Sequence, residues 1–302
     1  MFGPEFEQFD VVVGGVRIHG VRGGSGPPVL LVHGFPQSHV MWHRIAPELA
    51  RGHTVVAADL RGYGDSDRPE AGHDHAGYSF RAMAGDQVAL MAALGFDRFS
   101  VVGHDRGARV THRMALDHPE RVERLALLDI LPTAYVFDHV DRALATAYYH
   151  WFFLAQPADL PERLIGGDPL YYLHRSLGSW GSSLDAHAPE ALRSYERAFA
   201  DPAARYAMIE DYRAAASVDL EHDAASVAAG RRIAAPCLVL WGENSTVGRN
   251  AERPLDVWRG LAADPAIVDG HAVAGAGHFL AEENHDDTLA ALRAFLNGPN
   301  GS

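Results

Sequence analysis

The run GHDRG at residues 103–107 places a glycine two residues before Asp105 and another two residues after it. It stands between an apolar stretch and a helical one, which is the pattern of a nucleophile elbow with aspartate where serine usually stands. The glycines allow a sharp turn from strand to helix, so that the central side chain projects near the helix N-terminus, where the dipole favours a negative group. The plainer interpretation is an aspartate that only caps a helix, because aspartate is a preferred N-cap residue.

Two further loops supply what such a nucleophile needs. Residues 33–37, HGFPQ, follow an apolar run at the place of an oxyanion-hole donor, so the backbone N–H groups of Phe35 and Arg106 are expected to converge on one oxygen. Residues 275–279, GAGHF, follow the last predicted strand, and His278 stands where the base belongs in the order nucleophile, acid, base. Both loops favour the catalytic interpretation over a simple cap.

Two carboxylates are candidates for the acid that orients His278. Asp129 ends the strand that follows the elbow helix, and Glu243 ends the next strand. We prefer Asp129, because a short carboxylate at the carboxyl edge of a strand points into the crevice where sites of such sheets lie. Glu243 stays open as the alternative, and Asp129 could instead be a simple N-cap residue.

A carboxylate nucleophile changes the reaction. An aspartate that attacks carbon directly forms an ester, and a water activated by histidine then hydrolyses this ester at its carbonyl. The scheme suits a displaceable group on sp³ carbon, as in alkyl halides or epoxides, better than amides. It needs no metal ion and no cofactor, and we expect neither.

Arg106 and Arg109 are spaced i, i+3 on the first turn of the elbow helix, immediately beside Asp105. Cations at a helix N-terminus oppose the helix dipole, so the placement is locally unfavourable. Either both arginines face solvent or pair with acids in a chain of net charge −13, or they bind a substrate carboxylate, whose geometry the guanidinium fork matches. A small haloacid fits the second interpretation.

The surrounding elements alternate between strands and helices. Strands are expected at 11–21, as a hairpin turning at Gly14-Gly15, and at 27–34, 53–60, 98–105, 122–130, 236–244 and 267–274; helices are expected at 40–50, 79–94, 106–117, 252–263 and 286–296. About a hundred residues after Pro132 show a mainly helical sequence pattern, and the tail NGPNGS is expected to be frayed. The prediction is an α/β fold with a mostly parallel sheet flanked by helices, in which a helical cap, 132–230, is inserted between two core parts, 1–131 and 231–302.

Composition narrows the classes of partner. The 302 residues carry a net charge of −13, which disfavours nucleic acid and anionic membrane surfaces, since both require a basic face. Cys237 is the one cysteine, so no intramolecular disulfide is possible. The acidic first residues lack the pattern of a secretory signal, and no run approaches the length of a membrane span, so we expect a cytoplasmic location and a small-molecule partner.

At this point a resemblance becomes specific. The segments that carry it are HGFPQ, ADLRGYGDSDRP, YSFRAMAGDQ, GHDRGARV, LDILPT, YHWFFLAQP and EDYRAA. Together they resemble the fluoroacetate dehalogenases of the α/β-hydrolase superfamily over nearly the whole chain, most weakly in 181–200 and 244–272. The stretch NSTVGRN at 244–250 departs from the pattern, which leaves the access route open.

The resemblance implies a role for each matching residue. Asp105 is the implied nucleophile, Asp129 and His278 the pair that activates water, and Arg106 and Arg109 the clamp for the substrate carboxylate. It also implies a halide pocket formed by His150, Trp151 and Tyr212. Trp180 is implied as an aromatic residue that lines the site. Without the resemblance, His150 and Trp151 would be interpreted as packing of the cap. Homodimers are usual in that family, so a homodimer is an expectation.

Two other functions compete with the haloacid interpretation. An epoxide hydrolase would share the HGFP turn and the aspartate nucleophile but would protonate the epoxide with cap tyrosines, for which Tyr148, Tyr149, Tyr171 and Tyr212 are candidates. Against it, an uncharged epoxide gives Arg106 nothing to hold. A non-catalytic ligand receptor on a hydrolase fold is the third possibility, which the presence of nucleophile, acid and base candidates disfavours.

Overall fold

The computed structural model describes residues 1–250 and 254–298, and its centre is one eight-stranded sheet of order β1-β2-β4-β3-β5-β6-β7-β8. The strands are β1 Phe6–Val13, β2 Val16–Gly24, β3 Pro28–Val32, β4 Thr54–Ala58, β5 Phe99–His104, β6 Val122–Leu128, β7 Cys237–Gly242 and β8 Val268–Val273. Strand β2 pairs antiparallel with β1 and β4, and the pairings from β4 through β8 are all parallel. The predicted α/β fold with a mostly parallel sheet is therefore confirmed.

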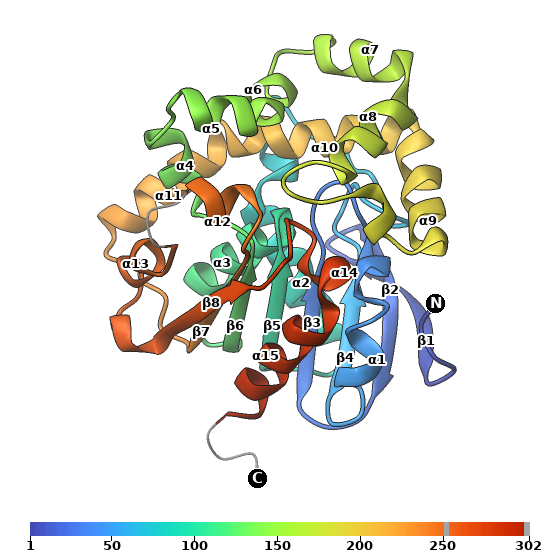
Figure 1. Cartoon of the computed structure of the whole chain (residues 1–302). Helices are drawn as coiled ribbons and strands as arrows, with labels where there is room; N and C mark the ends of the chain where they lie inside the picture. Colours follow the sequence, from blue (N-terminus) through green and yellow to red (C-terminus); the bar gives the residue numbers. More distant parts are fainter. Residues whose placement is uncertain (251–253, 299–302) are drawn as a thin grey trace.

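The central strands are buried on both faces. Every residue of β4 and β5 is buried, and Val29 to Val32 of β3 have no exposed surface. Continuous apolar runs of this kind form because helices cover both sides of a parallel sheet. Figure 1 shows α2 and α3 on one face of the sheet and α1 and α15 on the other.

The predicted hairpin turns where it was expected. Val13 pairs with Val16, and Gly14 and Gly15 between them have φ of 56° and 82°. Two consecutive residues at positive φ are what a two-residue hairpin turn requires, and glycine adopts them without a Cβ clash.

The core helices predicted at 79–94, 106–117 and 286–296 are confirmed, those predicted at 40–50 and 252–263 differ in the structure, and the short helices at 246–250 and 280–283 were not predicted. The core helices are α1 Ala46–Leu49, α2 Phe80–Ala93, α3 Arg106–Asp117, α12 Thr246–Asn250, α13 Pro254–Arg259, α14 Leu280–Glu283 and α15 His285–Asn297, with 3-10 turns at His39–Trp42, Ala76–Tyr78 and Pro265–Ile267. The single helix predicted over 40–50 is wrong: a 3-10 turn ends at Trp42 and α1 starts at Ala46, because Pro47 lacks an N–H and fits only the first turn of a helix.

The helix predicted over 252–263 is shorter in the structure. Helix α13 runs from Pro254 to Arg259 and ends before Gly260, a residue that disfavours helix continuation. Residues 252 and 253 of that prediction lie outside the described residues, as do residues 299–302 of the predicted frayed tail.

Eight helices follow Pro132 and stack above the sheet, at the end where its parallel strands finish (Figure 1). They are α4 Thr133–Asp138, α5 Arg142–Ala147, α6 Tyr149–Leu154, α7 Leu160–Gly167, α8 Pro169–Leu177, α9 Pro189–Ala200, α10 Pro202–Ala215 and α11 Val218–Ala228, with a 3-10 turn at Leu184–Ala186. We call residues 133–228 the helical segment. It occupies the range predicted for the cap.

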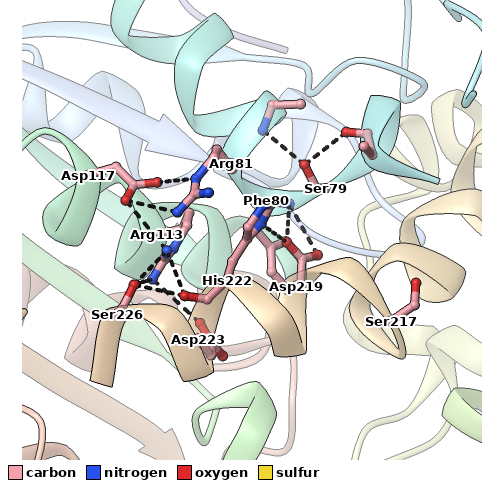
Figure 2. Close-up of polar contacts among 12 residues, drawn as sticks. Ser79, Phe80, Arg81, Arg113, Asp117, Ser217, Asp219, His222, Asp223 and Ser226 are labelled. Atoms are coloured by element: carbon pink, nitrogen blue, oxygen red, sulfur yellow. Dashed lines mark hydrogen bonds and ion pairs between the residues drawn. The ribbon is translucent and has the colours of Figure 1, made fainter. Parts of the chain in front are cut away.

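The end of the helical segment is fixed to the core by buried charge. In Figure 2, Arg113 of α3 lies between Asp117 of its own helix and Ser226 of α11, whose Oγ accepts from both Nη atoms at 2.9 Å. Asp219 of α11 accepts the backbone N–H of Phe80 at the start of α2. These contacts join α11 to both helices on one face of the sheet.

None of the helices in the described residues combines the length and the apolar composition that a membrane span requires.

Candidate active site

Asp105 stands alone between β5, which ends at His104, and α3, which begins at Arg106. Its φ of 49° and ψ of −117° are rare for a residue with a side chain, and such strain is tolerated where the surrounding structure enforces it. A Cβ on Gly103 would overlap the carbonyl oxygen of Gly107, and one on Gly107 would overlap that of His33. The flanking glycines therefore allow the close packing that projects Asp105 above the sheet.

The loop after β3 meets this aspartate. The backbone N–H of Phe35 donates to Asp105 Oδ1 at 2.9 Å. A Cβ on Gly34 would stand 2.7 Å from both Asp105 Oδ1 and the backbone nitrogen of Arg106, so the two predicted donors and the carboxylate share one small space. Oδ1 thus lies where the predicted oxyanion donors meet, and Oδ2 lies on the side of His278, 3.7 Å from its Nε2.

His278 lies between the two aspartates. Its Nδ1 is 2.6 Å from Asp129 Oδ2, and its Nε2 is 3.7 Å from Asp105 Oδ2. Asp129 Oδ1 accepts from the backbone N–H of Gly242 at 3.0 Å and from Ser245 Oγ at 2.6 Å. Asp129 is therefore fully hydrogen-bonded and oriented toward the imidazole, as an acid that fixes a catalytic tautomer must be.

Glu243, the alternative acid, is engaged elsewhere: its Oε2 accepts the backbone N–H of Gly275 at 2.9 Å. Ser245 belongs to the stretch 244–250 that departs from the family pattern, and most of this stretch forms α12. The structure thus gives this stretch a role in holding the acid. Sequence reasoning missed Ser245, for which no motif provided a signal.

The charges of the site reinforce one another. Burial raises the pKa of Asp105, but the charges around it, led by that of His278, together outweigh burial, so the pKa lies below its ordinary value and the carboxylate is anionic at neutral pH. Burial would lower the pKa of His278, but the hydrogen bond and charge of Asp129, followed by the charge of Asp105, raise it above its ordinary value. An anionic nucleophile beside a histidine with an orienting acid fits the two-step scheme.

Arg106 is completely buried and is paired with an acid that sequence reasoning did not single out. Its Nε donates to Asp211 Oδ2 at 3.0 Å, its Nη2 also contacts Asp211 Oδ1, and Tyr63 donates to Asp211 Oδ2 at 2.6 Å. Burial would lower the pKa of Arg106, but the charge of Asp211 raises it above its ordinary value. Among the described residues, Arg106 Nη1 has no hydrogen-bond partner. One edge of the guanidinium is anchored, and one nitrogen remains to donate to a ligand.

Arg109 is held differently. Its Nη1 donates to the carbonyl of Leu131 at 2.7 Å and to Thr133 Oγ1 at 3.0 Å, where the helical segment begins. Its Nε has no partner in the described part of the chain. Burial, followed by the charge of Arg106, lowers the pKa of Arg109 to about 10, and the charge of Asp105 offsets this only in part, so the group is still a cation at neutral pH.

The residues assigned to halide binding face the same two arginines. Tyr212 of α10 lies with its ring 4.2 Å from Arg106 Cζ, and Trp151 of α6 with its ring 4.4 Å from Arg109 Cζ. His150 Nδ1 and the Tyr212 hydroxyl are buried and, within the described residues, have no hydrogen-bond partner. Burial lowers the pKa of His150 to about 3, so its ring is neutral.

Trp180 packs against both His150 and His278. Its ring centroid lies 4.6 Å from that of His150 and 5.2 Å from that of His278, and its φ is 55°. It therefore lies between His278 and His150, one of the residues that the family resemblance implies for halide binding. All the residues that sequence reasoning placed in the site meet at the carboxyl end of the parallel strands.

Comparison with known proteins agrees with this geometry. Residues 27–285 match the model of the alpha/beta hydrolase fold family. The chain is 48% identical over 293 residues to a fluoroacetate dehalogenase from Burkholderia sp, covering 97% of this chain and 94% of that protein. It is 34% identical to a soluble epoxide hydrolase from Corynebacterium sp. (strain C12), covering 96% of this chain and 98% of the other.

Solved structures give the same result. A protein from Nostoc sp PCC 7120 superposes with a TM-score of 0.92 at 53% identity, over 96% of this chain and 98% of the other. The chain belongs to the α/β-hydrolase family, and it is a hydrolase of that fold. The resemblance to the fluoroacetate dehalogenases, drawn from seven segments of sequence, is confirmed by the 48% identical relative.

Proposed function

We propose that this hydrolase releases halide from short 2-haloacids, with fluoroacetate converted to glycolate and fluoride. Asp105 Oδ2 attacks the carbon that bears the halogen, forms an ester and expels halide. Water activated by His278 then attacks the ester carbonyl, whose oxygen is held by the Phe35 N–H, and glycolate leaves. We further propose that residues 132–230 act as the cap that carries the halide-binding residues.

One observation carries this proposal: two buried arginines stand beside the nucleophile, each with a nitrogen that lacks a hydrogen-bond partner among the described residues. A buried cation with an unsatisfied donor is costly, and a carboxylate supplies both the charge and the acceptors. Asp211 anchors Arg106 but leaves Nη1 for a ligand. The 48% identical fluoroacetate dehalogenase supports the same substrate class.

Epoxide hydrolysis is the second candidate, because a 34% identical relative is a soluble epoxide hydrolase and Tyr212 has a buried hydroxyl without a partner in the described residues. Of the four candidate tyrosines, Tyr149 and Tyr171 are exposed, at 50% and 67%, whereas Tyr148 and Tyr212 are buried. A neutral epoxide brings no negative charge to Arg109, whose guanidinium donates only to uncharged oxygens in the described residues, so the haloacid is favoured.

The test is to incubate the purified protein separately with fluoroacetate, chloroacetate and a panel of epoxides. The proposal predicts free fluoride and glycolate in equal amounts from fluoroacetate. Diol formation from epoxides without any halide release would support the second candidate. Absence of turnover on every compound would favour a ligand receptor.

Removal of the Arg109 charge tests the carboxylate clamp. Arg109→Leu deletes charge-assisted hydrogen bonds worth about 1.5–3 kcal/mol each, so kcat/KM for chloroacetate should fall by about 10-fold to 100-fold. Thr133→Val is the matched control, because it removes one acceptor of the same guanidinium and leaves its charge in place. Unchanged kcat/KM in Arg109→Leu would contradict the clamp.

Trp151→Phe tests the assignment of a fluoride donor. Fluoride accepts strong hydrogen bonds as the carbon–fluorine bond stretches, so a donor aimed at it stabilises the transition state more than the bound substrate. Loss of the indole N–H should lower fluoroacetate turnover about tenfold more than chloroacetate turnover. Phe137→Leu is the control, since the ring centroids of Phe137 and Trp151 lie 5.5 Å apart and this substitution loosens the packing without removing a hydrogen-bond donor. An equal loss for both substrates would make Trp151 a packing residue.

A further inference from the structure

The loop that carries His278 is fixed through its main chain by a single carboxylate. Glu283 Oε2 accepts the backbone N–H of Gly277 at 2.8 Å, and Oε1 accepts that of Phe279 at 2.8 Å. The two amides are the immediate neighbours of His278 in sequence. From the other side, His104 Nε2 donates to the carbonyl oxygen of His278 at 2.8 Å. The peptide groups on both sides of the histidine are therefore held in place.

Glu283 reaches these amides because it ends α14, whose first turn begins at Phe279. The backbone N–H of Glu283 donates to the carbonyl oxygen of Phe279 at 2.9 Å, while the Glu283 side chain accepts from the Phe279 N–H. The first bond is the ordinary opening bond of the helix, and the second resembles one half of a capping box, in which a glutamate satisfies an N–H that the helix leaves free. A second amide, that of Gly277, goes beyond what helix capping requires.

We propose that Glu283 is a positioning residue for the general base: it holds the main chain on both sides of His278 and sets the imidazole at its working distance from Asp105. This inference rests on the proposed function, in which His278 activates the water that hydrolyses the ester. The histidine must serve a water molecule placed against the ester carbonyl, and misplacement by about 1 Å can cost about 100-fold in rate.

Charge adds a second effect of the same residue. The ionisable groups around His278 are Asp129, Asp105, His104, His150 and Glu283. The Glu283 carboxylate is one of the anions that raise the pKa of His278, after Asp129 and Asp105. Its removal should therefore lower this pKa, and the neutral base should persist to lower pH.

The experiment is Glu283→Gln, with kcat for chloroacetate measured across the pH range. Glutamine can accept only one of the two amides, because its NH₂ group faces the other. We expect the kcat plateau to fall about tenfold or more, and the acid limb of the profile to move to lower pH. Glu283→Asp keeps the charge but is too short to reach both amides, so it should lower the plateau while its acid limb stays near that of the wild type.

Asp286→Asn is the matched control. It removes one negative charge three residues further along the chain, from a side chain that is 88% exposed, and should change neither the plateau nor the acid limb. A wild-type profile in Glu283→Gln would overturn the proposal. A lower plateau with an unmoved acid limb in Glu283→Gln would reduce Glu283 to a helix cap and also overturn it. Failure of the proposed function is distinguishable, because the wild-type protein itself would then release no halide.

Discussion

Asp105→Asn is expected to abolish halide release, with a loss of about 10⁴-fold or more, comparable to removal of a nucleophile in other enzymes. The amide cannot act as the displacing anion, because it carries no charge and the lone pair of its nitrogen is delocalised into the carbonyl, which makes it a weak nucleophile. The fold should survive, since the amide oxygen can still accept the N–H of Phe35, which Asp105 Oδ1 accepts at 2.9 Å. The measurement is the rate of halide release together with the thermal unfolding midpoint.

Hydrolysis of the introduced amide back to aspartate would mimic activity in this variant. Intact-protein mass spectrometry before and after the assay detects that repair. Sustained release of halide from protein whose amide is intact would remove Asp105 from its role as nucleophile.

The second large effect is expected from His278→Asn. Displacement of halide needs only Asp105 and the clamp, whereas hydrolysis of the ester needs the base, whose Nδ1 lies 2.6 Å from Asp129 Oδ2. The variant should therefore release about one halide per protein molecule and then stop. Its mass should increase by one carboxymethyl group, and the adduct should map to the peptide that contains Asp105.

Ser245→Ala is a milder variant that weakens the same part of the site. It removes the hydroxyl that donates to Asp129 Oδ1 at 2.6 Å, while His278 stays in place. Hydrolysis of the ester should slow but continue. An unmodified His278→Asn protein, with Asp105 intact, would mean that the histidine does not serve the second step.

The elbow could be predicted because its determinants are local. Gly103 and Gly107 are needed for close backbone packing around Asp105, so the sequence pattern and the structural requirement coincide. Asp129 and His278 were found by their order along the chain and their place after strands. Asp105 and Asp129 are far apart in sequence, and they come together because the parallel sheet places the ends of β5 and β6 side by side. His278 then contacts Asp129 from the loop after β8.

The partner of Arg106 could not be predicted in the same way. Asp211 lies 105 positions further along, in a helix whose orientation over the sheet depends on the packing of the whole helical segment. The only signal was the segment EDYRAA, which contributed to the family resemblance but did not indicate a contact. The alternative in which the arginines pair with acids thus describes one edge of Arg106. On the other edge, Nη1 has no hydrogen-bond partner in the part of the chain that the structure describes, and we propose this nitrogen as the donor to substrate.

Helix prediction failed where proline and tertiary contacts took precedence over local patterning. Residues 40–50 contain enough apolar positions for one amphipathic helix, but Pro47 cannot occupy its interior. Ser38 instead caps a short 3-10 turn, whose His39 donates its backbone N–H to the buried carboxylate of Asp59 at 2.7 Å. The segment that follows β3 is therefore held by the carboxylate of Asp59, 20 positions further along the chain, rather than by helix propensity.

The most direct test of the central claim is a single turnover of haloacetate by excess wild-type protein in water enriched in ¹⁸O. If Asp105 forms an ester that is hydrolysed at its own carbonyl, the hydroxyl oxygen of the first glycolate comes from the protein. The glycolate should then be unlabelled, and the label should appear in the carboxylate of Asp105. Labelled glycolate with an unlabelled Asp105 would show that water displaces the halide directly, and would contradict the covalent mechanism.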